Sequence, residues 1–324
     1  MVIRQVSSEL PSISALLPSR NGEKYLSRLV PQILAMLREN DELLVVNDGS
    51  TDNSALVLAD QAASDTRVRI LITEGVGLVA ALNLGIANAR NPWIARFDVD
   101  DEYLPDRLNL QRQLIGSDVA VIFSDYSFIS STGVRLGTVP SAITSSQTKL
   151  SLVTSQRTPH PVALLNRASA LSVGGYRPED FPAEDLGLWL RMVGMGKFLS
   201  VPAVLLNYRL SGGSISSSNR RDQLTKKNSL ISDFSAWHVL VESCVREFGS
   251  TIFCYLKQGK PTARIILHLR DIAEASRFSG SKVSITKLLI SLPLYSLIKI
   301  PFVLLDFSVK SVLRRFYRLM KNFF

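Results

Sequence analysis

Three short apolar runs alternate with helical patterns along the first ninety residues of the chain. The runs 13–17, 42–46 and 68–72 have strand length, and each ends in a polar or glycine-containing turn. Apolar side chains recur at helical spacing within 26–37 and within 78–89. Strands that alternate with helices predict an α/β fold with a mostly parallel sheet flanked by helices. In such sheets, ligands bind beyond the carboxyl ends of the strands.

Polar clusters follow several of these runs. They occupy residues 18–22, 47–52 and 98–101, and the last contains Asp98, Asp100 and Asp101 directly after an apolar segment. Like charges so close together repel each other, and a divalent cation with the polar face of a nucleotide would relieve that repulsion. The sequence therefore predicts a metal and nucleotide site on one rim of the sheet. A solvated acidic turn is the alternative.

Composition limits the class of protein. The chain has 324 residues and 46% hydrophobic content, enough to bury one large or two small domains. Its two cysteines, Cys244 and Cys254, form neither a disulfide framework nor a metal-ligand spacing, which favours a reducing compartment. No apolar segment of signal length precedes Pro11, so we expect a cytoplasmic catalytic part.

The basic excess of the chain lies in its last part. Residues 257–324 carry 13 Lys or Arg against three acids, whereas residues 1–256 carry 24 against 25. Prolines and charges interrupt the apolar stretch around 288–305, which argues against a simple transmembrane helix. At helical spacing, residues 309–321 would place apolar and basic side chains on opposite faces. The apolar face holds Val309, Val312, Leu313, Phe316, Tyr317 and Met320, and the basic face holds Lys310, Arg314, Arg315, Arg318 and Lys321.

This two-faced pattern is typical of a helix that lies in a membrane interface. Binding of nucleic acid and packing of the helix on a protein core are the alternatives. We favour an anionic membrane surface over nucleic acid, because the apolar face exceeds what phosphate contacts require. The expected location is cytoplasmic, peripheral on the inner face of the cell membrane.

A series of motifs resembles family-two glycosyltransferases. The likeness spans residues 11 to 215 in the expected order, through the segments 14–22, 45–52, 80–87, 95–101, 160–165, 174–176, 183–191 and 207–209. The resemblance implies the GT-A fold and inverting transfer of a sugar from a nucleotide-diphosphate sugar, with uridine as the expected base. The Gln and Arg-Trp motif of processive synthases is absent, which favours addition of one sugar per acceptor.

The resemblance also assigns roles on the donor side. Asp48 would accept a hydrogen bond from the base, although an Asx turn explains it equally when taken alone. Asp98 would hold the ribose, and Asp100 would ligate Mg²⁺ or Mn²⁺ that bridges the phosphates. Asp101 would either order water around the ion or cap a helix ahead of Pro105. Further donor-binding positions are Pro18, Asn21 and Asn83.

On the acceptor side, Asp185 is the expected catalytic base, because it begins an amphipathic helix that would hold it rigidly. The competing interpretation is that Glu184 and Asp185 simply favour the dipole of the first helical turn. His160, Glu184 and Arg209 are expected near the acceptor or the diphosphate, with Arg209 in a mobile basic loop. A packed structural role is the alternative for His160, and His238 and His268 are expected to be surface or core residues.

The predicted organisation is a GT-A catalytic domain at 1–220 and a helical region at 221–324 that ends in the basic amphipathic tail. The predicted acceptor is a lipid-linked glycan used in cell-surface polysaccharide synthesis. A nucleotidyltransferase is one alternative, but the segment after the first strand, 18–22, is too short and too poor in glycine for its phosphate loop. A non-catalytic membrane scaffold is the other, and it would require loss of metal and base positions that are present.

Overall fold

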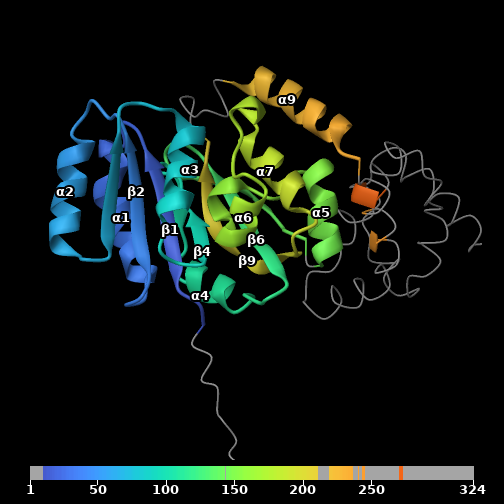
Figure 1. Cartoon of the computed structure of the whole chain (residues 1–324), viewed down its shortest axis with the longest axis horizontal. Helices are drawn as coiled ribbons and strands as arrows, with labels where there is room; N and C mark the ends of the chain where they lie inside the picture. The colour runs from blue at the N-terminus through green and yellow to red at the C-terminus, as the bar shows by residue number, and fades with distance from the viewer. Residues whose placement is uncertain are drawn as a thin grey trace, which may run out of the picture. The chain divides into compact units, whose positions relative to one another are not determined.

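The computed structural model describes residues 10–142, 144–210, 219–235, 240, 243–244 and 270–272 (Figure 1). The chain divides into two compact units, the first formed by residues 1–141 and 158–233 and the second by 142–157 and 234–324. The predicted amphipathic helix at 309–320, Cys254, His238 and His268 lie outside the described residues. The domain boundary that the sequence predicts at residue 220 stays a prediction.

The first unit contains a nine-stranded sheet, counted over the described residues. Its main path runs β3-β2-β1-β4-β8-β6-β9-β5, and β7 pairs with β6. Six strands run in one direction, and β5, β7 and β8 run in the other. The strands are β1 (Ile13–Ser19), β2 (Glu42–Asp48), β3 (Val68–Thr73), β4 (Trp93–Arg96), β5 (Glu102–Tyr103), β6 (Val119–Ile129), β7 (Arg135–Val139), β8 (Leu164–Asn166) and β9 (Lys197–Arg209).

Helices connect the parallel strands as the apolar periodicity predicts. The helices are α1 (Glu23–Met36), α2 (Ser54–Ser64), α3 (Leu78–Asn88), α4 (Arg107–Arg112), α5 (Ser145–Val153), α6 (Arg167–Ser172), α7 (Glu184–Met192) and α9 (Arg220–Asp233), with 3₁₀ turns η1 (His160–Val162) and η2 (Pro178–Asp180). The path from β3 to β4 crosses the sheet in the opposite direction from the path β1-β2-β3. Right-handed crossovers therefore put α3 on the face opposite α1 and α2.

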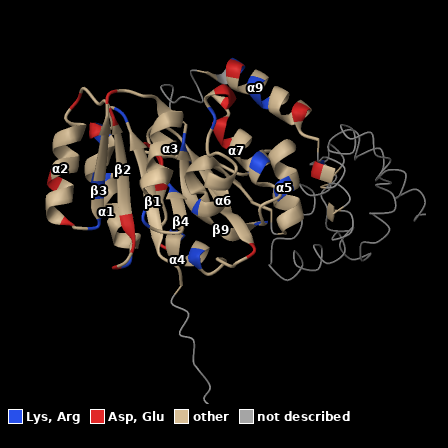
Figure 2. Cartoon of the chain, viewed as in Figure 1, with Lys and Arg blue, Asp and Glu red and all other residues tan. Residues whose placement is uncertain are grey.

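The centre of the sheet is covered on both faces. Every residue of β1 and β2 is buried, as expected for parallel strands between two helical layers. The middle of these strands carries few charged side chains, and most charges lie at strand ends and on helices (Figure 2). Helix α3 approaches β1 most closely at Gly85, where an added Cβ would lie 2.2 Å from Leu16 Cδ1.

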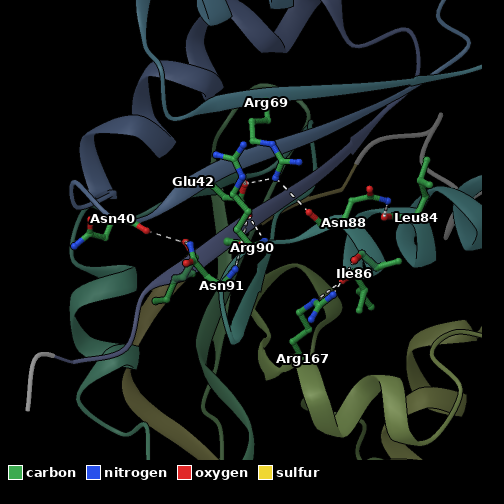
Figure 3. A network of polar contacts seen from close by, with 12 residues as sticks. Asn40, Glu42, Arg69, Leu84, Ile86, Asn88, Arg90, Asn91 and Arg167 are labelled. Atoms are coloured by element: carbon green, nitrogen blue, oxygen red, sulfur yellow. Dashed lines mark hydrogen bonds and ion pairs between the residues drawn. The ribbon is translucent and has the colours of Figure 1, made fainter.

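The amino ends of the strands are tied together by a polar network around Glu42 (Figure 3). The buried Glu42 carboxylate accepts hydrogen bonds from Ser14 Oγ, the Arg90 amide and Arg69 Nη1, each at 2.6 Å. Burial tends to raise the pKa of Glu42, but these hydrogen bonds lower it below its usual value. Arg167 donates to the carbonyls of Ile86 and Ala87 at the end of α3, each at 2.7 Å. This end of the sheet is thus closed by internal contacts, and the opposite end carries the loops of the site.

The second unit is described only in part. Within it, Arg157 pairs with the fully buried carboxylate of Asp271, and Thr154 Oγ1 donates to the same carboxylate at 3.0 Å. This pair connects the segment after α5 to residues 270–272. Among the residues that the structure describes, none of the helices has the length and apolar character needed to span a membrane.

Candidate functional site

The turn after β2 is organised by Asp48. Its buried carboxylate accepts hydrogen bonds from Thr73 Oγ1 at 2.6 Å, the Val76 amide at 2.7 Å and the Gly77 amide at 2.9 Å. Burial tends to raise the pKa of Asp48, but these three donors, with the charge of Arg20, lower it. Oδ2 receives one of these donors and keeps a second lone pair for a ligand. Asp48 therefore fixes the loop between β3 and α3, and its role towards a base stays a prediction.

The turn after β1 lies against the turn after β2. Asn21 Oδ1 accepts a hydrogen bond from the Thr51 amide at 2.8 Å, and the Asn21 amide donates to Ser50 Oγ at 2.9 Å. Pro18 is buried within β1, opposite Val46 in the register. Gly49 has φ +64°, and a Cβ there would lie 2.6 Å from the Gly75 nitrogen, so the close approach of the turn after β2 to the loop between β3 and α3 requires glycine. The structure thus brings the predicted segments 18–22 and 47–52 together on one rim of the sheet.

Asp98, Asp100 and Asp101 form the acidic turn between β4 and β5. Tyr103 holds this turn, because its hydroxyl accepts the Asp98 amide at 2.6 Å and donates to the Asp98 carbonyl at 3.3 Å. Burial and the nearby Asp98 raise the pKa of Asp100. Burial also raises the pKa of Asp101, with Asp98 adding to the effect, and Asp101 Oδ2 has no hydrogen-bond partner. Negative charge in this turn is therefore incompletely compensated by the protein.

Two buried arginines lie beneath the acidic turn. Arg96 is 2% exposed and pairs with Asp98 Oδ1 at 2.5 Å. Arg107 is fully buried, donates to the Arg96 carbonyl at 2.7 Å and stacks on the rings of Phe97 and Tyr103 at 4.0 and 4.8 Å. Burial lowers the pKa of Arg107 to about 10. Neither arginine is predicted from the sequence as part of the site. Arg96 stands inside an apolar run and Arg107 between Asp106 and Leu108, and neither pattern reveals the partners that make burial of the charge possible.

Two predictions for the rim need correction. Asp101 does not cap the helix after Pro105, since Asp106 is the residue that precedes α4, and Asp101 Oδ1 instead accepts the Arg209 amide at 2.7 Å. Arg209 is not in a mobile loop. It ends strand β9, is 7% exposed and pairs with Glu102, while it donates to the carbonyls of Asp100, Ser130 and Ser131. Its guanidinium therefore joins the acidic turn to the β6-β7 hairpin.

The acidic pair at the start of α7 matches its predicted location. Glu184 is 7% exposed, and its Oε2 has no hydrogen-bond partner. Burial, followed by the charge of Asp185, raises the pKa of Glu184 to about 7. Burial also raises the pKa of Asp185, which Lys227 counteracts. Asp98 acts electrostatically on both carboxyls, so the turn after β4 and the first turn of α7 face one site.

His160 and Asn83 hold the wall next to this pair. His160 is buried, and its Nε2 lies 2.7 Å from the Tyr176 hydroxyl. Burial, followed by the charge of Arg96, lowers the pKa of His160 well below its usual value, so the ring is neutral at physiological pH. Asn83 donates to the Tyr176 carbonyl at 2.8 Å and accepts the Tyr176 amide at 2.9 Å. The Asn83 side-chain amide thus hydrogen-bonds to the Tyr176 backbone through both its nitrogen and its oxygen. Its role in binding a nucleotide-sugar donor stays a prediction.

A divalent cation fits the acidic turn. The donor set consists of carboxylates, which Mg²⁺ and Mn²⁺ prefer, and the raised pKa of Asp100 and the unpaired Asp101 Oδ2 indicate room for positive charge. Among the described residues, no group of three or more His, Cys, Asp or Glu side chains has the arrangement of a complete metal site. An ion at Asp100 would therefore take further ligands from substrate phosphates and water.

Comparisons with known proteins agree with this geometry. Residues 14–172 match the model of glycosyl transferase family 2. The putative glycosyltransferase EpsH of Bacillus subtilis is 31% identical over 119 residues, which cover 37% of this chain and 35% of EpsH. Two uncharacterized glycosyltransferases of Rickettsia are covered to 37% and 33% of their length, so the chain spans about a third of these relatives.

Solved structures show the same fold. S. aureus TarS 1–349 in complex with UDP-GlcNAc superposes with a TM-score of 0.57 at 18% identity, over 86% of this chain and 87% of that one. The mannosyltransferase PcManGT from Pyrobaculum calidifontis, in complex with GDP-Man and Mn²⁺, gives 0.50 at 15% identity, over 88% and 80%. With the α/β architecture and the motif order, these matches confirm the GT-A fold. The chain is therefore similar to glycosyl transferase family 2 over residues 14–172, just under half of its length, and it has the fold of sugar-transferring enzymes.

Proposed function

We propose that this protein transfers one sugar, with inversion, from a nucleotide-diphosphate sugar to an acceptor hydroxyl, in a reaction that depends on a divalent cation. The observation that carries the proposal is the meeting of two carboxylate pairs. Asp98 and Asp100 lie in the turn after strand β4, Glu184 and Asp185 begin α7, and Asp98 acts electrostatically on both members of the second pair. An acidic metal position opposite a second acid is the arrangement that such a transfer requires.

On the donor side, the turns after β1 and β2 supply the nucleotide wall. Asp48 offers its remaining Oδ2 lone pair to a base, and Asn21 fixes the neighbouring turn. Asp98 binds the ribose, and Asp100 holds the cation. The cation, when bound, neutralises charge that develops on the departing diphosphate. TarS, in complex with UDP-GlcNAc, and PcManGT, in complex with GDP-Man and Mn²⁺, have the same fold, which supports a nucleotide-sugar donor and a divalent ion.

On the acceptor side, Asp185 takes the hydroxyl proton as the oxygen attacks the anomeric carbon. The anomeric carbon gains a bond to the acceptor oxygen and loses its bond to the diphosphate, which keeps the electron pair. Helix α7 holds Asp185 in a fixed position, because Leu188, Trp189 and Met192 of this helix are buried. The neutral His160 lines the same wall through Tyr176 and adds no competing positive charge.

The proposed acceptor is a lipid-linked glycan in cell-surface polysaccharide synthesis, presented at the inner face of the cell membrane. The support for this comes from the sequence of the tail and from the family resemblance.

The proposal is tested with the full-length protein and the variant Asp185→Asn. Calorimetry with UDP- and GDP-sugars, with and without Mn²⁺, should show metal-dependent donor binding in both proteins. Turnover should fall about 10²- to 10⁴-fold in the variant, because the amide keeps the shape of the carboxylate but not its basicity. Absence of nucleotide-sugar binding by the wild type would refute the function. Wild-type turnover in the variant, with chemistry rate-limiting, would remove Asp185 as base and direct the test to Glu184.

A further inference from the structure

Helix α9 turns two lysines towards the protein body. Its half-buried residues recur at helical spacing, whereas Leu224 is 61% exposed. A helix that packs on a protein normally places apolar side chains on such a stripe. Ammonium groups in that position lose solvation, which is unfavourable unless nearby acids compensate. The half-buried stripe consists of Gln223, Lys226, Lys227, Leu230 and Ile231.

A hydrogen bond shows what this stripe faces. Gln223 Nε2 donates to the Pro182 carbonyl at 3.0 Å, two residues before Glu184 begins α7. Helix α9 contacts α7, and the two helices lie next to each other in Figure 1. Lys227 follows Gln223 by four residues and therefore lies on the same side of α9, one turn further along. The inward face of α9 thus brings a cation to the start of α7.

Lys227 is the cation that acts most strongly on Asp185. Burial raises the pKa of Asp185, and the Lys227 ammonium lowers it. Lys227 forms none of the ion pairs found among the described residues, so its charge is available to the site. The other charged or titratable groups around this end of α7 are Glu184 on α7, Asp98 after β4, Tyr176, Arg96 through its effect on Glu184, and the mutually paired Asp180 and Arg191.

We propose that Lys227 is a positioning residue for the base of the transfer reaction, and that its ammonium holds Asp185 as a carboxylate at neutral pH. The inference rests on the proposed function, because it assigns Asp185 the acceptor proton. In the reaction, that proton moves from the acceptor oxygen to a carboxylate oxygen of Asp185. Without the Lys227 ammonium, burial of Asp185 and repulsion from Asp98 would favour a protonated and therefore inactive base. Lys227 offsets that repulsion from a helix that the family match, residues 14–172, does not reach.

The test is the pH dependence of kcat/KM in full-length Lys227→Met. Loss of the ammonium should move the acidic limb of the profile to higher pH by about 0.5 to 1 unit, because a nearby cation favours the carboxylate. Activity on the acidic side should therefore fall about 3- to 10-fold and recover at higher pH. Lys227→Arg keeps the charge and should keep the wild-type limb. If Lys227→Met folds poorly, as judged by its thermal transition, Lys227→Gln provides a second neutral variant.

Lys226→Met is the matched control, since it removes the same charge one position earlier from the same stripe. The acidic limb of the kcat/KM profile of Lys226→Met should stay at the wild-type pH. Donor binding by calorimetry separates the remaining outcomes. A neutral Lys227 variant with an unmoved limb overturns the inference but leaves the proposed function intact. A neutral Lys227 variant that binds the donor more weakly at every pH, with an unmoved acidic limb, also overturns the inference. That result would assign Lys227 to binding of the diphosphate. Failure of the wild type to bind or transfer any nucleotide sugar refutes the proposed function itself.

Discussion

Glu184 is a buried carboxyl without a hydrogen-bond partner for one of its oxygens, and its pKa is raised from the usual 4.5 to about 7. The folded state therefore prefers the protonated form over the interval between these two values. As pH rises from about 4.5 to 7, ionisation in the unfolded state lowers the free energy of unfolding, and the loss persists above pH 7. Such a rise in pKa corresponds to about 3 kcal/mol.

Glu184→Gln removes this ionisation. The variant should match the wild type in free energy of unfolding near pH 4, and become more stable than it as pH rises, by up to about 3 kcal/mol above pH 7. Urea titrations in the presence of a chelator, at several pH values, measure the difference without a bound cation. Parallel stability curves for the two proteins would show that Glu184 is ionised at no cost to the fold.

Asp100 gives a second prediction for a single residue. Asp100→Asn should abolish metal-dependent transfer and weaken binding of nucleotide diphosphates, because the amide removes the charge that attracts the cation. The fold should be retained, since no donor from another residue bonds to this side chain among the described contacts. Asp106→Asn, at an exposed position before α4, is the matched control. Unchanged metal-dependent donor affinity in Asp100→Asn, measured by calorimetry, would contradict the assignment.

At the scale of elements, the contact between α3 and β1 limits what can change. A Cβ at Gly85 would lie 2.2 Å from Leu16 Cδ1, and Leu16 is 1% exposed, so its side chain has little space to move. Gly85→Ala should lower the free energy of unfolding by about 1 to 3 kcal/mol through overpacking, despite the better helix propensity of alanine.

Gly137 in β7 provides the comparison for Gly85. A Cβ there meets nothing within 4 Å, and the position is exposed. Gly137→Ala should leave the denaturation midpoint close to that of the wild type, so that the two alanine variants separate overpacking from backbone effects. Equal midpoints for both variants would mean that Leu16 and α3 rearrange without cost.

The parallel elements of the fold could be predicted from the sequence, and several others could not. Strands β1, β2 and β3 and helices α1 and α3 follow directly from apolar period and turn residues, because their partners are near in the chain. Strand β9 lies between β6 and β5, a position that depends on pairing with residues about 80 positions earlier. No local pattern contains that information.

The same distinction holds in the site. The acidic turn and the Glu184-Asp185 pair could be predicted, because each is one short motif at the end of an element. The cap predicted for Asp101 is wrong because a donor 108 positions away, the Arg209 amide, takes the carboxylate. Lys227 could not be found from sequence, because α9 lacks a clear apolar face, and only its contact with α7 shows that Lys227 is the lysine that acts on Asp185.

For the whole molecule, the uneven charge of the chain leads to a prediction about membranes. The segment 257–324 contains 13 Lys and Arg residues but only three acidic residues. Each basic residue near an anionic leaflet contributes about 1 kcal/mol of attraction, and salt screens this contribution but not apolar insertion. Full-length protein should therefore float with anionic vesicles more than with neutral ones, and less so at high salt.

A charge variant of the full chain tests the location of this attraction. Replacement by Gln of the five basic residues Lys310, Arg314, Arg315, Arg318 and Lys321 should reduce flotation with anionic vesicles and leave nucleotide-sugar binding unchanged. Equal flotation of the variant and the wild type would place the attraction elsewhere in the chain. Equal flotation of the wild type on neutral and anionic vesicles would remove electrostatics as its cause.

The interior position of β9 also has a consequence for synthesis. Strand β6 ends at Ile129, and its parallel partner begins at Lys197. The ribosome adds about 5 to 20 residues per second. Roughly 3 to 14 s therefore pass between the synthesis of Ile129 and that of Lys197. During this interval an eleven-residue, almost entirely buried strand has an open apolar edge, the kind of surface that pairs with other chains. Conditions that slow translation between residues 130 and 197 should therefore lower the soluble yield of the protein.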